Sequence, residues 1–193
     1  GTRVSAAHPS AAETHIDRLG PASRPSPLVQ RGEPFVDDAE RVVLSARLAD
    51  LAGDGEPASF ELAGPRAEIF HEPATLGVGI VTCGGLCPGL NNVVRSIVLR
   101  LWYAYGARRI LGFRYGYAGL APRHGHAPLV LTPDVVEPLH EQGGTRLGTS
   151  RGPQDVGEMV DRLVELDIGL LFVLGGDGGL RGASALHAEI ARR

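Results

Sequence analysis

The chain has 193 residues, 43% of them hydrophobic, and a formal net charge of −3, which suits one globular domain with or without short appendages. This charge gives no general attraction to nucleic acid or to an anionic membrane surface. No apolar run approaches the roughly 18 residues that a membrane-spanning helix requires. We therefore expect neither nucleic acid nor membrane among the partners of this chain.

The N-terminal part has no regular hydrophobic pattern. Residues 1–33 are rich in Ala, Ser and Pro, show no secretory signal, and are predicted to form a disordered tail. Residues 34–75 contain short apolar pieces, such as 41–45 and 59–63, separated by Gly, Asp and Pro. We interpret residues 34–75 as an N-terminal extension that packs on the main domain.

From residue 76 the pattern changes to alternating strands and helices. Residues 77–81 are apolar and predict a buried parallel strand, and 92–105 predict a largely apolar helix. A second strand is expected at 108–113, leading into a loop rich in turn residues at 115–120. These elements begin a domain that we expect to occupy residues 76–193.

The second half of this domain continues the alternation. Thr132-Pro133-Asp134 marks a helix start, because proline suits the first helical position. Residues 154–167 form an amphipathic pattern, 168–174 an apolar strand, and a final helix runs toward Arg193. The sequence therefore predicts an α/β fold with an open, mostly parallel, doubly wound sheet covered on both faces. Ligands of such folds bind beyond the carboxyl ends of the strands.

A first glycine-rich segment, Thr82 to Asn91, lies between the first predicted strand and helix. Its glycines suit a sharp turn close to a ligand, and the start of the following helix attracts phosphate. It also carries both cysteines, Cys83 and Cys87. A disulfide or a zinc pair is conceivable, but two ligands do not complete a tetrahedral site. We interpret both as small buried thiols in a reducing compartment, which fits a cytoplasmic location.

Two further glycine-rich segments carry charged side chains. Gly175 to Gly179 surrounds Asp177, which could hold Mg²⁺ on nucleotide phosphates or cap a helix after a tight turn. Gly143 to Pro153 contains two arginines and is either a phosphate-binding loop or a solvated turn. All nineteen basic residues are arginine, so a lysine-centred phosphate loop is excluded.

Together these segments resemble the 6-phosphofructokinases, and Cys-Gly-Gly-Leu-Cys-Pro-Gly is similar to their plant-like, ATP-dependent branch. Ala63 to Arg66, followed by Ile69-Phe70, resembles part of the N-terminal extension of that branch. The resemblance covers residues 34–193 and rests on four segments in the family's order and spacing: Ile80 to Asn91, Phe113 to Leu120, Gly143 to Gly152 and Gly175 to Gly178.

The resemblance implies a glycolytic kinase that transfers the γ-phosphoryl group of ATP to the 1-hydroxyl of fructose 6-phosphate. It assigns catalytic roles to Gly84 and Arg151 and Mg²⁺ binding to Asp177. Gly178 favours ATP over pyrophosphate as the phosphoryl donor, because an aspartate at this position would repel the α-phosphate of ATP. The full-length enzyme would be a homo-oligomer. The nucleotide-binding residues implied by the resemblance are Gly84, Gly85, Arg151, Gly152, Gly176, Asp177, Gly178 and Gly179.

Two departures from the family pattern limit this expectation. Gly179 replaces the usual Thr or Ser and supplies no hydroxyl. The Thr-Ile-Asp-Asn-Asp segment, whose first aspartate is the family's catalytic base, would follow beyond Arg193. We therefore expect the chain to be an inactive N-terminal half of the nucleotide lobe. Alternatives are a pyrophosphate-dependent phosphofructokinase, or a non-catalytic nucleotide-binding fragment or pseudoenzyme. Lipid and NAD kinases share Gly-Gly-Asp-Gly but would not be expected to show the first segment.

Overall fold

The computed structural model describes residues 14–51, 57–85 and 87–193, and the chain divides into two units, residues 1–71 and 72–193. Part of the predicted tail, residues 1–13, and Leu86 of the first glycine-rich segment lie outside the described residues. None of the helices in the described ranges has the length and apolar character of a transmembrane segment.

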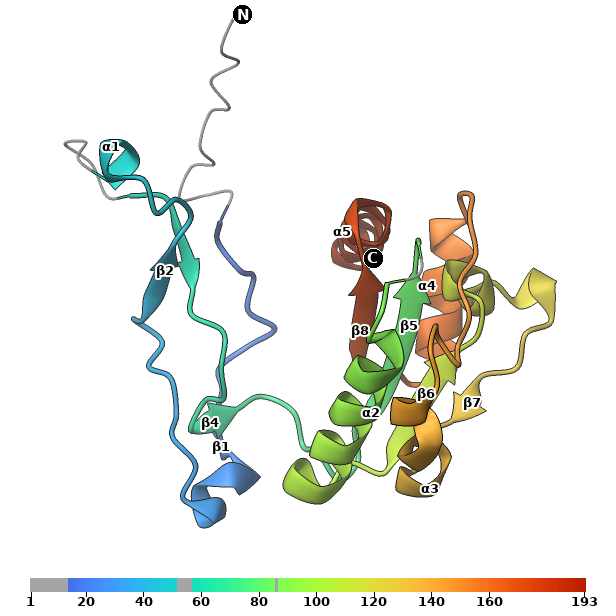
Figure 1. Cartoon of the computed structure of the whole chain (residues 1–193), viewed down its shortest axis with the longest axis horizontal. Coiled ribbons are helices and arrows are strands. Elements are labelled where there is room, and N and C mark those ends of the chain that lie inside the picture. Colours follow the sequence, from blue (N-terminus) through green and yellow to red (C-terminus); the bar gives the residue numbers. More distant parts are fainter. Residues whose placement is uncertain (1–13, 52–56, 86) are drawn as a thin grey trace, which may run out of the picture. The chain divides into compact units, whose positions relative to one another are not determined.

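The second unit is built on a four-stranded sheet with the order β7-β6-β5-β8 (Figure 1). Strand β5 runs parallel to both of its neighbours, β6 and β8, whereas the short edge strand β7 is antiparallel to β6. The prediction of a mostly parallel sheet is confirmed, and β7 adds an antiparallel edge strand that was not predicted. The strands are β5 (Gly77–Cys83), β6 (Arg109–Phe113), β7 (Leu129–Val130) and β8 (Leu170–Gly175).

Helices connect these strands close to the predicted positions. The first predicted helix is α2, continued by a π-helical turn at Leu101–Tyr105 that ends at Gly106, which adopts a left-handed conformation (φ 78°). Short 3₁₀ turns lie at Gly116–Leu120, Pro122–His124 and Glu137–Glu141. The helices of this unit are α2 (Leu90–Arg100), α3 (Pro133–Val136), α4 (Val156–Glu165) and α5 (Asp177–Arg192).

Apolar side chains fill both faces of the sheet. On one face Val78 and Ile80 of β5 pack with Val94 and Val98 of α2. On the other face a second cluster joins β5 and β6 to α4 and α5, and its member Phe113 is fully buried. Because both faces are covered, every residue of β5 is buried and the strand reads as a continuous apolar run rather than an alternating one.

The register of the sheet determines where its loops begin. Strands β5 and β8 pair in parallel as far as Cys83 and Gly175. The loops that follow these two residues therefore leave from the same edge of the sheet. This edge is where ligands bind in open parallel sheets.

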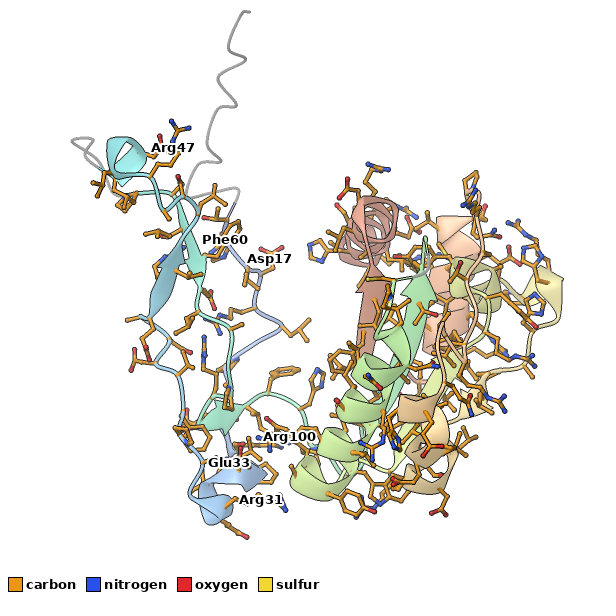
Figure 2. All side chains as sticks on the ribbon, viewed as in Figure 1. Asp17, Arg31, Glu33, Arg47, Phe60 and Arg100 are labelled. Atoms are coloured by element: carbon orange, nitrogen blue, oxygen red, sulfur yellow. The ribbon has the colours of Figure 1, made fainter. Side chains whose placement is uncertain are left out.

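The first unit contains two small antiparallel pairs: β1 (Arg24–Pro25) with β4 (Glu68–Ile69), and β2 (Arg41–Val43) with β3 (Ser59–Glu61). The short helix α1 (Leu48–Leu51) and a 3₁₀ turn at Pro27–Arg31 complete it. Leu28 is fully buried, whereas the cross-strand partners Val42 and Phe60 remain 46% and 39% exposed (Figure 2 labels Phe60). Two-stranded sheets alone bury little apolar surface.

Part of the predicted tail has regular structure. Residues 24–31 form β1 and the 3₁₀ turn, because the Ser26 hydroxyl caps that turn by accepting from the Leu28 amide and the Ser26 amide donates to the Ala67 carbonyl. The division of the chain into tail, extension and nucleotide domain stays a prediction, and the structural boundary falls after His71.

Candidate functional site

Two of the predicted glycine-rich segments are joined by threonine hydroxyls. Thr82, fully buried at the end of β5, donates to the Gly148 carbonyl at 2.7 Å and lies 3.0 Å from the Thr145 hydroxyl. The Thr149 hydroxyl donates to the Gly84 carbonyl at 2.7 Å. The loop that carries Arg151 is therefore held against the turn between β5 and α2.

A buried asparagine holds the other end of the same loop. The Asn91 amide nitrogen donates to the Gln142 carbonyl at 2.9 Å, and its oxygen accepts from the Arg146 amide at 2.7 Å. Asn91 is only 3% exposed in the first turn of α2. No role for Thr82 or Asn91 was predicted from the sequence. One feature of the sequence could have predicted these roles: Thr82 lies near the end of an apolar strand and Asn91 near the start of a largely apolar helix. A polar side chain buried at such a position needs a hydrogen-bond partner, because leaving it unpaired costs free energy.

The predicted glycines divide into open and packed positions. A Cβ added at Gly84, Gly85, Gly152, Gly176 or Gly178 would meet no atom of the described residues within 4 Å. These backbone segments therefore leave room for a ligand to approach closely.

Two other glycines of the third segment are packed instead. A Cβ at Gly175 would lie 2.4 Å from the Cys83 carbonyl oxygen, and one at Gly179 would lie 3.3 Å from the Cys83 Cβ. Gly179 is buried, so the position where the family carries a hydroxyl faces Cys83 rather than open space.

The helices that begin at this edge have no side-chain caps. Helix α2 starts after Gly89 and α5 after Gly176, and neither first turn receives a side-chain hydrogen bond. Helix α4, by contrast, is capped by Asp155, whose carboxylate accepts from the Glu158 amide at 2.8 Å. Uncapped amides at a helix start can bind an anion. Because Gly176 occupies the N-cap position, Asp177 is not the N-cap that one sequence interpretation suggested.

The charged groups of the site are solvent-exposed. Within the described part of the chain, neither the Asp177 carboxylate nor the Arg151 guanidinium has a hydrogen bond or ion pair. Among the same residues there is no group of three or more His, Cys, Asp or Glu side chains that could enclose a metal ion. Mg²⁺ commonly binds through one or two carboxylates plus substrate phosphates. A single free carboxylate beside an open backbone fits that mode.

Comparison with known proteins shows the family to which this chain belongs. The phosphofructokinase family model matches residues 77–192, which include all three glycine-rich segments. The chain belongs to the phosphofructokinase family. The ATP-dependent 6-phosphofructokinase of Amycolatopsis methanolica is 48% identical over 163 residues, covering 82% of this chain and 35% of that protein. The enzyme of the same name from Entamoeba histolytica is 45% identical over 161 residues, covering 83% and 36%.

Solved phosphofructokinases share the fold. The structure of phosphofructokinase from Saccharomyces cerevisiae superposes with a TM-score of 0.52 at 29% identity, covering 60% of this chain and 16% of that one. This chain spans about a third of the length of the curated relatives named above. The resemblance to the phosphofructokinases found in the sequence is confirmed for the family and the fold.

The two cysteines of this chain are free thiols that differ in burial. The interpretation that both are buried is wrong for Cys87, which is exposed in the turn before α2. Cys83 is buried, and burial raises the pKa of its thiol from 9.0 to about 11. A hydrogen bond with Tyr117 only partly offsets this effect on the pKa.

We predict unequal alkylation of these thiols. At pH 8 Cys83 should react with iodoacetamide roughly 100-fold more slowly than an unperturbed thiol, because its pKa of about 11 lowers the thiolate fraction. Cys87 should react readily. Peptide mass spectrometry at successive times measures both rates, and labelling in 8 M urea, where both thiols are free, is the control. Equal rates in the folded protein would contradict the burial of Cys83.

We also predict that Thr82→Val destabilises the phosphofructokinase domain by about 1–3 kcal/mol. Valine keeps the shape of threonine but leaves the Gly148 carbonyl and the Thr145 hydroxyl without this buried partner. Urea unfolding followed by circular dichroism measures the free energy of unfolding. Thr75→Val, at an exposed threonine, is the matched control and should change stability by less than about 0.5 kcal/mol. Equal stability of both variants would show that the Thr82 hydroxyl does not hold the loop.

Proposed function

We propose that this chain supplies the nucleotide-binding part of an ATP-dependent 6-phosphofructokinase. The reaction transfers the γ-phosphoryl group of ATP to the 1-hydroxyl of fructose 6-phosphate. Such transfer depends mainly on positioning and on neutralising charge at the phosphates, and less on covalent chemistry by the protein. The open backbone, the uncapped helix starts and the free charges of the site supply these functions.

The proposed roles follow the geometry. The Gly84 and Gly85 amides approach the transferred phosphate, and Arg151 with Gly152 contacts the nucleotide phosphates through a permanent charge. Because Gly176 and Gly178 have no side chains, phosphate oxygens can approach the backbone at the start of α5. Asp177 would hold Mg²⁺, which would neutralise negative charge on the nucleotide phosphates. Gly179 packs against Cys83 and offers the phosphates a backbone amide but no hydroxyl.

One observation carries this proposal. The parallel pairing of β5 with β8 ends at Cys83 and Gly175, so the two open glycine-rich turns start side by side. The Thr149 hydroxyl then attaches the Arg151 loop to the same place. Three segments far apart in the sequence thus supply amides, a guanidinium and a carboxylate at one edge, and the ATP-dependent names of the relatives agree with that composition.

Binding and turnover test the proposal separately. Calorimetric titration of the chain with ATP in the presence of Mg²⁺ should show binding that ATP alone in EDTA reproduces only weakly. The full-length gene product should form ADP only when both ATP and fructose 6-phosphate are present, in an assay coupled to NADH oxidation. Absence of Mg²⁺-dependent ATP binding to both proteins would overturn the proposal.

Two alternatives are distinguished by the same experiment. Pyrophosphate replacing ATP as phosphoryl donor would indicate a pyrophosphate-dependent enzyme, although the open space at Gly178 favours the larger nucleotide. Binding of ATP without turnover by the full-length product would indicate a non-catalytic nucleotide-binding protein. Homo-oligomerisation and a cytoplasmic location of the full-length product belong to the same proposal.

A further inference from the structure

A half-buried tyrosine connects the loop after β6 to the first turn of α5. Tyr117, in the 3₁₀ turn Gly116–Leu120, donates its hydroxyl proton to the Gly179 carbonyl at 2.6 Å. This distance lies at the short end of the normal range for hydroxyl donors. The bond joins residues far apart in the sequence, and its acceptor lies two residues after Asp177.

Glycines allow α5 to approach this tyrosine. A Cβ at Gly182 would lie 2.3 Å from the Tyr117 ring, so only glycine fits one turn along the helix without displacing the ring. On the adjacent side Gly179 packs against Cys83. The first turn of α5 is therefore seated between the Tyr117 ring and the end of β5.

The hydroxyl of Tyr117 is also linked to the end of β5. The Cys83 side chain and the Tyr117 phenol influence each other's pKa, so the two side chains are neighbours. Burial, with a contribution from Cys83, raises the pKa of Tyr117 above its ordinary value. The phenol therefore stays protonated and remains a donor throughout the neutral and mildly alkaline range.

We infer that Tyr117 is a positioning residue for the nucleotide site: its hydroxyl fixes the first turn of α5 so that the Asp177 carboxylate and the Gly178 amide face the phosphates. The inference rests on the proposed nucleotide function. No side chain caps α5 at Gly176, so the first turn lacks the usual local anchor. Tyr117 supplies an anchor from a different loop. Its hydroxyl donates to the Gly179 carbonyl, whereas the side chain of a usual N-cap residue accepts from a backbone amide of the first turn.

The test compares Tyr117→Phe with Tyr103→Phe. Phenylalanine keeps the ring against Gly182 and removes only the hydroxyl, whereas Tyr103 is 64% exposed on the π turn after α2 and serves as the matched control. Hydrogen exchange of the chain without nucleotide should be several-fold faster over residues 177–183 in Tyr117→Phe and unchanged in Tyr103→Phe. Unchanged exchange in both variants would overturn the inference, whatever the nucleotide data show.

The second measurement separates positioning from a purely structural role. Tyr117→Phe should weaken ATP binding in the presence of Mg²⁺ by roughly 3- to 10-fold, the range expected for one lost hydrogen bond, and change binding in EDTA less. Faster exchange with unaltered Mg²⁺-dependent affinity would overturn the positioning role. Failure of the unmodified chain to bind ATP with Mg²⁺ would overturn the proposed function instead, and the exchange comparison distinguishes this result because it contains no nucleotide.

Discussion

Replacement of Asp177 by asparagine is expected to lower the affinity of the chain for ATP in the presence of Mg²⁺ by at least about 100-fold. Groups that only orient a metal ligand typically contribute 10- to 100-fold to metal affinity, and Asp177 is proposed as the ligand itself. Asparagine preserves size and removes the negative charge. The Asp177 side chain has no partner in the described residues, so stability should change little.

Calorimetric titration with and without Mg²⁺ measures this effect. The affinity for ATP in EDTA should be unchanged or slightly higher in Asp177→Asn, because a charge that repels bare phosphates has been removed. Asp167→Asn is the matched control, since Asp167 is an exposed carboxylate before β8, where it forms an ion pair with Arg109. Full Mg²⁺ dependence retained in Asp177→Asn would exclude Asp177 as the metal ligand.

Replacement of Gly175 by alanine is expected to destabilise the second unit by about 1–3 kcal/mol and to weaken ATP binding at the same time. The new methyl group would lie 2.4 Å from the Cys83 carbonyl oxygen, so β5 and β8 must separate at the edge where the site forms. Adding atoms to a well-packed position costs energy of this size. Separation of the strands also moves the two glycine-rich turns apart.

Urea unfolding and ATP titration of the same variant measure the two effects. Gly143→Ala is the control, because an added Cβ at Gly143 meets no described atom within 4 Å and its φ is not in the left-handed region. That change should leave stability unaltered or slightly raised, since alanine restricts the unfolded chain. Equal stability of Gly175→Ala and Gly143→Ala would show that the strand pair adjusts without cost.

Much of the fold could be predicted because its signals are local. The apolar runs before Thr82 and before Gly175 identified β5 and β8, and the spacing of apolar residues at 154–167 identified α4. The start of α3 after Thr132 followed from proline at the first helical position. Short elements gave weaker signals, so β7, the β1–β4 pair and the β2–β3 pair were not anticipated. Such short strands form because they pair with a neighbouring strand, and their own residue composition contributes little.

The family, the α/β class and the glycine-rich segments with Arg151 and Asp177 could be predicted from the sequence, because they depend on residue types at fixed spacings. Which glycines face open space and which pack against Cys83 is visible only in the folded chain, because neighbours distant in the sequence occupy that space. The tertiary structure also assigned the anchoring hydrogen bonds to Thr82, Asn91 and Tyr117. A hydroxyl or an amide can bond to many groups, and only the packing of the sheet and its loops selects the partner.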